Sequence, residues 1–258
     1  MKHALDTYAH LDSPIHRWEP RCKLVALFAL IFAFSFVQQL SLLPVMIAVT
    51  IAYFIASKLP VSFLLTRLRY PGFFLAAIAI LLPFTVGDTI LFQLGFLALR
   101  VEGLIALYLI ATRFICILTI SLILFGTAPF LTHIKAMRSL GLPSLLADMA
   151  LLSYRYIEQF GNDLKTMQRA MRLRGFRASK LSFRNLSVLA SLAGSLLVRS
   201  YEQSEQVYKA MCLRGYGQAP PRRRRQEFKM RRRDAIALIL TFAIAAGFVV
   251  AEFWVGGS

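Results

Sequence analysis

The sequence is poor in acidic residues and in cysteine. It has 13 Asp and Glu against 30 Lys and Arg, which gives a formal charge of +17 at pH 7. Charged residues make up only 17% of the chain, below the roughly 25% found in soluble domains. The three cysteines, Cys22, Cys116 and Cys212, are scattered and form no Cys-x-x-Cys pair. This number and spacing predict neither a disulfide framework nor a zinc site.

Sequence motifs that carry chemistry are also missing. The phosphate loop G-x-x-x-x-G-K-[ST] is absent, so the chain is not expected to hydrolyse ATP by that route. The four histidines form no H-x-x-x-H or H-E-x-x-H pattern, and no G-x-S-x-G segment surrounds a serine. No apolar run contains the paired carboxylates of a proton relay. We therefore expect no catalytic site, no metal site and no cofactor in this chain.

Apolar residues make up 57% of the chain, and the mean hydropathy is +0.60. The five predicted spans cover residues 24–37, 42–56, 73–86, 101–125 and 235–253. The apolar stretch 89–99 is too short to cross alone, so we expect it to extend the third span or to lie at the membrane surface. Basic clusters around the first two spans predict an amino terminus in the cytoplasm, and five crossings then put the carboxyl terminus outside.

Basic residues are concentrated between the fourth and fifth runs, where residues 127–233 hold 21 Lys and Arg against six Asp and Glu. Such segregation indicates one large basic region on the cytoplasmic side. The expected fold is an all-α polytopic membrane protein with about five transmembrane helices and a cytoplasmic pair of long crossing helices. Its parts are a membrane region of four helices (1–126), a cytoplasmic helical domain (127–217), a basic linker (218–233) and a last transmembrane helix (234–258).

The cytoplasmic domain has the periodicity of three helices. A short helix is expected at 130–140, closed by a Gly-Leu-Pro stop. From Ser144 to Met171 apolar residues recur every three or four positions, which predicts one helix of about 45 Å. Another long helix is predicted at 183–214, and its small residues around Gly194 favour close packing of two backbones. The simplest arrangement is two crossed helices; the alternative is an antiparallel pair whose ends have no function.

Both long helices end on the same phrase, Ala-Met-Arg-Leu-Arg-Gly-Phe at 170–176 and Ala-Met-Cys-Leu-Arg-Gly-Tyr at 210–216. A glycine just past a helix accepts the left-handed conformation that ends it, and an arginine in the last turn complements the helix dipole. One copy alone is an ordinary helix stop. Two copies in a chain without other chemical motifs favour a pair of helix ends that dock into two equivalent sites on another protein.

Two further basic features allow two interpretations each. The linker at 218–233 fits an anchor to anionic lipid, and a nucleic-acid patch is disfavoured because no stacking aromatic residues are interleaved. Arg113 lies within the fourth predicted span, where an unpaired charge is costly. It is either a hydrogen-bond donor to helix ends or a residue that couples motion through the membrane.

The chain resembles the transmembrane T component of energy-coupling factor (ECF) transporters, in their cobalt-transport (CbiQ-like) branch. The family usually has Asp before Pro-Arg in its amino-terminal motif, and Glu19 keeps that charge here. The likeness covers about residues 15–217, and the doubled A-x-x-x-R-G phrase is its most specific part. The matching segments are Glu-Pro-Arg-Cys-Lys at 19–23, Ala-Met-Arg-Ser-Leu-Gly-Leu-Pro at 136–143, Tyr-Arg-Tyr-Ile at 154–157 and the two A-x-x-x-R-G copies.

The resemblance implies a role as a non-catalytic coupling subunit. Each A-x-x-x-R-G helix end would lie in a groove of one of two ABC ATPase subunits, with Arg174 and Arg214 paired to acidic groups there. The small residues Ala170, Gly175, Ala210 and Gly215 would permit close approach. ATP and Mg would be bound by the ATPases, whose closure would move a separate substrate-binding integral membrane subunit. A small accessory membrane subunit is an optional further partner.

The resemblance also implies a prokaryotic cell membrane, and cobalt as the cargo, with nickel or a vitamin as the alternative. Two other classes of function compete with this interpretation. A basic membrane scaffold that recruits ribosomes or nucleic acid would use the same positive charge but would not need two equal helix ends. An intramembrane enzyme is disfavoured because no acid, histidine or serine constellation lies in the apolar runs.

Overall fold

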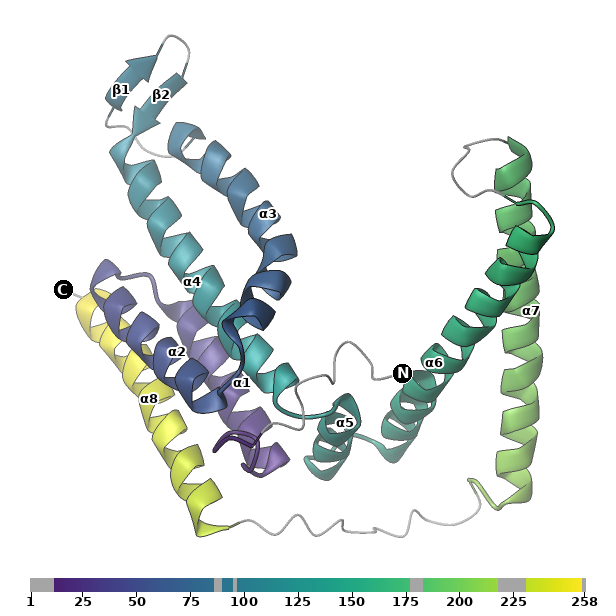
Figure 1. Ribbon diagram of the computed structural model, residues 1–258. Helices are drawn as coiled ribbons and strands as arrows, with labels where there is room; N and C mark the ends of the chain where they lie inside the picture. The colour runs from purple at the N-terminus through teal and green to yellow at the C-terminus, as the bar shows by residue number, and fades with distance from the viewer. Residues whose placement is uncertain (1–11, 86–89, 95–96, 177–182, 218–230, 257–258) are drawn as a thin grey trace. The chain divides into compact units, whose positions relative to one another are not determined.

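A computed structural model describes residues 12–85, 90–94, 97–176, 183–217 and 231–256. Its contacts divide the chain into two compact units, one of residues 1–140 with 227–258 and the other of residues 141–226. Within the described residues the chain is helical apart from one short hairpin (Figure 1). The expected all-α class of a polytopic membrane protein is confirmed.

The first unit is built around helix α1, Pro20–Phe36, which begins with a proline at its first position. It packs against α4 (Val101–Gly126) and α8 (Arg232–Gly256), although the latter comes more than 190 residues later in the chain. Phe34 meets Phe248 of α8 edge to face, with ring centroids 5.3 Å apart. Helix α2, Leu43–Ser57, follows a single 3₁₀ turn at Leu40–Leu42 and packs on α4. The apolar core of the unit lies among these four helices.

Four helical stretches of the described residues are long and apolar enough to cross a membrane. They are Leu40–Ser57, which joins the 3₁₀ turn to α2, and Val61–Ala79, Glu102–Gly126 and Arg232–Trp254. Helix α1 has 17 residues, the lower end of the length of a span. The third helix, α3, covers Val61–Thr85 and so begins twelve residues before the predicted span. Pro71 therefore lies inside a helix and does not open one, as neighbouring groups in membrane helices can satisfy the carbonyl it leaves free.

The stretch between α3 and α4 forms an antiparallel hairpin of β1 (Ile90–Leu94) and β2 (Leu97–Arg100). The sequence analysis expected this segment to extend the third span or to lie at the membrane surface, and it did not predict strands. Two short apolar runs separated by two residues are the arrangement that hairpins use. The acidic residue Asp88, which precedes this hairpin, lies outside the described residues.

Helix α5, Phe130–Ser139, was grouped from the sequence with the cytoplasmic helices, but it contacts α1 and belongs to the first unit. The second unit consists of α6 (Ser144–Leu173) and α7 (Phe183–Leu213), which run in opposite senses (Figure 1). An ion pair joins them, from Arg199 Nε to Asp163 Oδ2 at 3.9 Å. The small residues near Gly194 are exposed, and a Cβ built on Gly194 has no atom within 4 Å. Among the described residues no backbone packs closely at Gly194, so the expected close approach at this position is wrong for that part of the chain.

Candidate functional site

The end of α6 is closed by two backbone hydrogen bonds. The Gly175 N–H donates to the carbonyl of Arg172 at 3.0 Å, and the Phe176 N–H donates to the carbonyl of Met171 at 3.0 Å. Gly175 has φ of +83°, in the left-handed region that glycine adopts without strain. This pair of bonds is the Schellman motif, which satisfies carbonyls that the helix end leaves free.

The end of α7 repeats this geometry bond for bond. The Gly215 N–H donates to Cys212 O at 2.9 Å, the Tyr216 N–H donates to Met211 O at 3.0 Å, and φ of Gly215 is +82°. The repeated phrase is thus a repeated structure. It places Arg174 and Arg214 at the same backbone position, directly before the left-handed glycine.

Both helix ends are open to a partner. Leu173 and Leu213, which directly precede the two arginines, are 91% and 89% exposed. Arg174 and Arg214 are also exposed, and within the described part of the chain neither forms an ion pair. A Cβ built on Gly175 or Gly215 meets nothing within 4 Å, so the glycines leave open space beside each arginine. Each helix end thus presents an exposed leucine beside an arginine, and arginine is enriched among the residues that dominate binding energy at protein interfaces.

The two ends are well separated. Helices α6 and α7 have 30 and 31 residues, so each is about 45 Å long at 1.5 Å per residue. Because α6 and α7 run in opposite senses (Figure 1), their carboxyl-terminal ends, which Arg174 and Arg214 directly follow, lie at opposite ends of the pair. Ala170 and Ala210 are likewise exposed in the last turn of each helix. The arrangement offers two equal contacts at two places, and not one combined site.

An apolar groove of about 1150 Å³ lies between the first half of α6 and the second half of α7. Its α6 wall is the apolar face that the sequence periodicity predicts, and Tyr156 and Phe160 stack within it with centroids 5.9 Å apart. At its α7 wall, a side-chain hydrogen bond with Cys212 raises the pKa of Tyr208. Residues that line the groove include Leu145, Met149, Leu152, Ile157, Leu197, Val207 and Met211.

Arg113 of α4 reaches the end of α1. Its Nη1 donates to the carbonyls of Ser35 at 3.2 Å and Val37 at 3.3 Å. These carbonyls belong to the last turn of α1, where the helix itself supplies no donor. The contact agrees with the first interpretation of Arg113 in the sequence analysis, a hydrogen-bond donor to a helix end. The second interpretation, a role in coupling motion through the membrane, stays a prediction.

The sequence analysis missed a buried polar cluster at the start of α1. Lys23 is completely buried, and its Nζ donates to Thr127 Oγ1 at 3.1 Å, to Thr127 O at 3.3 Å and to Ile15 O at 3.4 Å. Nearby, Trp18 Nε1 donates to the carbonyl of Asp234 at 3.3 Å. The cluster therefore holds the end of α4 and the start of α8 against the amino-terminal segment. The only sequence signal was the Glu-Pro-Arg-Cys-Lys motif itself, because a lysine before an apolar run is usually a solvated flank.

Within the described residues, no group of three His, Cys, Asp or Glu side chains could hold a metal ion. Most of the basic linker predicted at 218–233 lies outside those residues, and Arg231, Arg232 and Arg233 are its described part. The features that remain for a functional site are the two helix ends, the groove and the buried cluster.

Comparison with known proteins finds relatives that match nearly the whole chain. The energy-coupling factor transporter transmembrane protein EcfT of Bacillus selenitireducens is 28% identical to this chain over 260 residues, which cover 97% of each protein. EcfT of Lactococcus lactis is 29% identical over 240 residues, 88% of this chain and 90% of the relative. EcfT of Listeria innocua is 29% identical over 265 residues, 98% of each. The sequence model of the CbiQ family, described as cobalt transport protein, matches residues 12–227, and the chain therefore belongs to that family.

Proposed function

We propose that this chain is the coupling subunit of an ECF transporter and that its two helix ends each bind one ABC ATPase subunit. The observation that carries the proposal is the duplicated end of α6 and α7, with the same hydrogen bonds, the same left-handed glycine and an exposed arginine at the same position. A partner made of two equal subunits presents two equal sites. A partner present in one copy would not require two identical helix ends.

The chemistry of each contact follows from the exposed groups. Arg174 and Arg214 each offer a planar guanidinium that pairs with a carboxylate through two parallel hydrogen bonds. The neighbouring Leu173 and Leu213 supply apolar area that a groove on the ATPase would bury. Once a contact is buried, removing one partner of the ion pair leaves an uncompensated charge, which costs about 3–5 kcal/mol.

The mechanical part of the proposal uses α6 and α7 as levers. ATP with Mg, bound by the ATPases, would draw the two subunits together and move the helix ends that they hold. The apolar groove between α6 and α7 shows that this unit does not bury its own apolar faces, which supports a further protein partner. That partner would be a substrate-binding integral membrane subunit, with a small accessory membrane subunit as an optional component. This chain would transmit motion without a catalytic site or a cofactor of its own.

The test is charge reversal at both ends, Arg174→Glu with Arg214→Glu, in the full complex. We expect the variant to stay in the membrane and to lose the co-purified ATPase subunits. The matched control is Arg169→Glu with Lys209→Glu, which reverses the residue before each repeated alanine and lies on another side of each helix. ATPase recovered at wild-type yield with the double variant, or lost equally with the control, would contradict the proposal.

We further propose that the cargo is cobalt, because the matching family is described as cobalt transport protein. Nickel or a vitamin is the alternative, since the relatives named EcfT carry no substrate in their name. Selectivity would lie in the separate membrane subunit, so the test is uptake of radioactive cobalt by cells that produce the complete complex. Cobalt uptake that requires both this chain and ATP hydrolysis supports the proposal. Uptake of nickel or of a vitamin in its place would refute the cobalt assignment.

The location proposed is the cell membrane of a prokaryote, with the amino terminus, α6 and α7 on the cytoplasmic side, where ATPases reside. The positive charge of residues 127–233 supports this orientation. A membrane-impermeant thiol reagent tests it through Cys212, which is exposed near the end of α7. Labelling of inverted vesicles, and not of intact cells, is the expected result.

A further inference from the structure

A second cavity, of about 760 Å³, lies in the first unit between α2, α8 and the segment before α1. Its long walls are apolar side chains of two membrane helices. Tyr53 of α2 and Thr241 of α8 join these walls, with their hydroxyl oxygens 2.6 Å apart. The apolar lining consists of Val49, Ala52 and Ala56 on α2 and Ala237, Leu240 and Ile244 on α8.

One end of this cavity is cationic. It carries Arg17, Lys58, Arg231 and Arg233, against the two carboxylates of Asp12 and Asp234. Lys58 directly follows α2 and Arg231 directly precedes α8. This basic end therefore lies at the level where two membrane-crossing helices leave the apolar layer, which is the level of lipid phosphates.

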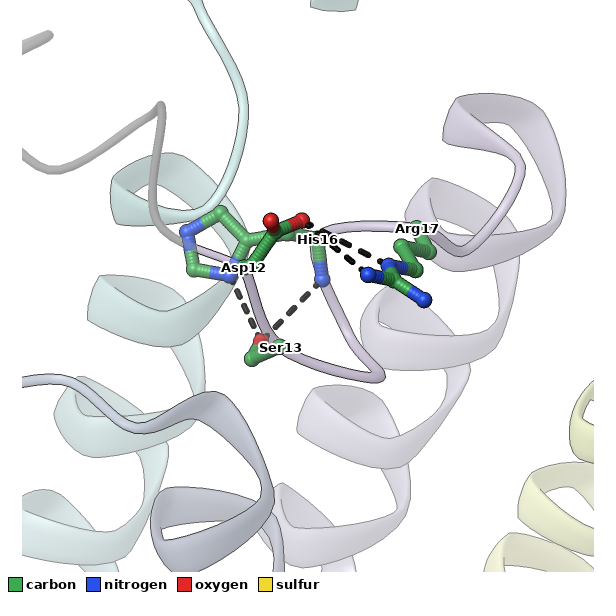
Figure 2. Close-up of polar contacts among 4 residues, drawn as sticks. All are labelled: Asp12, Ser13, His16 and Arg17. Carbon is green, nitrogen blue, oxygen red and sulfur yellow. Dashed lines mark hydrogen bonds and ion pairs between the residues drawn. The ribbon is translucent and has the colours of Figure 1, made fainter.

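The two carboxylates already have partners. Asp234 is buried, and its Oδ2 accepts a hydrogen bond from the Arg231 backbone N–H at 3.1 Å, which closes the start of α8. Asp12 Oδ1 accepts from Arg17 Nε at 3.4 Å and from Nη2 at 3.5 Å (Figure 2). That pair is 86% and 74% exposed, so water screens it strongly. Within the described residues, Lys58, Arg231 and Arg233 form no ion pair.

We propose that this cavity binds one anionic phospholipid, with the phosphate at Lys58, Arg231 and Arg233 and an acyl chain along the wall of α2 and α8. The chemistry of the cavity selects this ligand. A soluble anion would leave the apolar wall without a partner, and a neutral lipid would leave three cations unpaired. Basic pockets between membrane helices on the cytoplasmic side suit anionic headgroups for the same reason. The lipid would fasten the start of α8 to the end of α2.

Trp18 provides a probe at the cavity, because it lines the wall and is only 6% exposed. The chain has two tryptophans, so Trp254→Phe leaves Trp18 as the only indole. This variant is placed in phosphatidylcholine nanodiscs that contain a small, equal fraction of either brominated phosphatidylglycerol or brominated phosphatidylcholine. We expect the anionic brominated lipid to quench Trp18 more strongly, because the cavity concentrates it beside the indole.

The site variant is Lys58→Ala with Arg231→Ala and Arg233→Ala, and it should lower the preference for the anionic lipid at least about tenfold. The charge-matched control removes Arg223, Arg224 and Arg225 from the linker, outside the described residues, and should keep the preference. The charge-conserving variant Lys58→Arg, Arg231→Lys and Arg233→Lys should also keep it. Single alanine variants should each lower it in part, which preserves the test if the triple variant does not fold.

Several results would overturn the proposal. Equal quenching by the two brominated lipids would mean that the cavity does not select an anionic lipid. An equal loss in the linker control would mean that surface charge, and not the cavity, attracts the lipid. Abolition of the preference by inorganic phosphate would identify the occupant as a soluble anion. Loss of the preference in the charge-conserving variant would show that positive charge is not its basis.

Discussion

At each helix end a single glycine sets the geometry that presents the arginine. Gly175 and Gly215 have φ near +80°, where a side chain with a Cβ is strained. No atom lies within 4 Å of a Cβ built at either position, so in the free chain the need for glycine is conformational and not steric. The arginine before each glycine depends on this turn for its direction.

We therefore expect Gly175→Asn to be tolerated better than Gly175→Val. Asparagine adopts the left-handed conformation at low cost, whereas a β-branched residue there is a genuine outlier. The valine variant should destabilise the end of α6 by about 1–2 kcal/mol and weaken ATPase binding, and the asparagine variant should retain most of it. Equal ATPase recovery with the two variants would show that the left-handed turn is not required.

A second residue-scale prediction concerns the buried lysine cluster. Thr127→Val keeps the side-chain shape but removes the hydroxyl that accepts from Lys23 and donates to Ile123 O at 2.7 Å. A hydrogen bond to a charged group contributes about 1.5–3 kcal/mol, so the melting temperature in detergent should fall clearly. Thr66→Val is the control, because Thr66 makes the same bond to Ser62 O at 2.7 Å on an exposed surface. A similar small change in both variants would argue against a stabilising role for the cluster.

At the scale of the element, α6 and α7 must be stiff if they are to act as levers. Each contains an interior glycine, Gly161 and Gly194, where a Cβ would meet nothing within 4 Å. Glycine in a helix interior is about 1 kcal/mol less favourable than alanine. These glycines therefore lower the stability of the helices, and among the described residues they serve no close packing.

Gly161→Ala and Gly194→Ala should each raise the stability of the purified chain by about 0.5–1 kcal/mol, measured by thermal unfolding. Gly72→Ala, which is equally open but lies in α3, is the comparison for a glycine outside the two levers. Destabilisation by Gly194→Ala in the lone chain would mean that a backbone does approach this face. If the variant is stable alone but defective in the complex, the close approach is made by a partner.

The long helices were predictable because one regular pattern specifies each of them. The predicted ends of α6 and α7 agree with the structure to within two residues, since a periodic apolar face and a glycine stop both act locally. The hairpin at Ile90–Arg100 was not predictable in this way, because short apolar runs suit helix and strand alike. The burial of Lys23 was missed for a different reason: two of its three acceptors are contributed by Thr127, 104 residues later in the chain.

At the scale of the whole molecule, the chain combines a membrane unit with a pair of helices, α6 and α7, that have the same structure at their carboxyl-terminal ends. Neither unit contains, in its described residues, a cluster that could bind a metal. The duplicated helix ends were predictable because their sequence is repeated. The packing of α5 on α1 was not, because it depends on contacts between residues that lie far apart in the chain. The function proposed here belongs to the assembly, because one chain must hold two ATPase subunits at once.

Photo-crosslinking from both helix ends of the same chain tests most directly whether one chain holds two ATPase subunits at once. A photoreactive amino acid is placed at Leu173 and at Leu213, the exposed positions beside the two arginines, in the assembled complex. After irradiation, the account predicts a covalent product of one chain with two ATPase subunits, and products with one subunit from each single-site variant. Products with only one ATPase subunit from the double-site variant, or crosslinks to lipid alone, would contradict it.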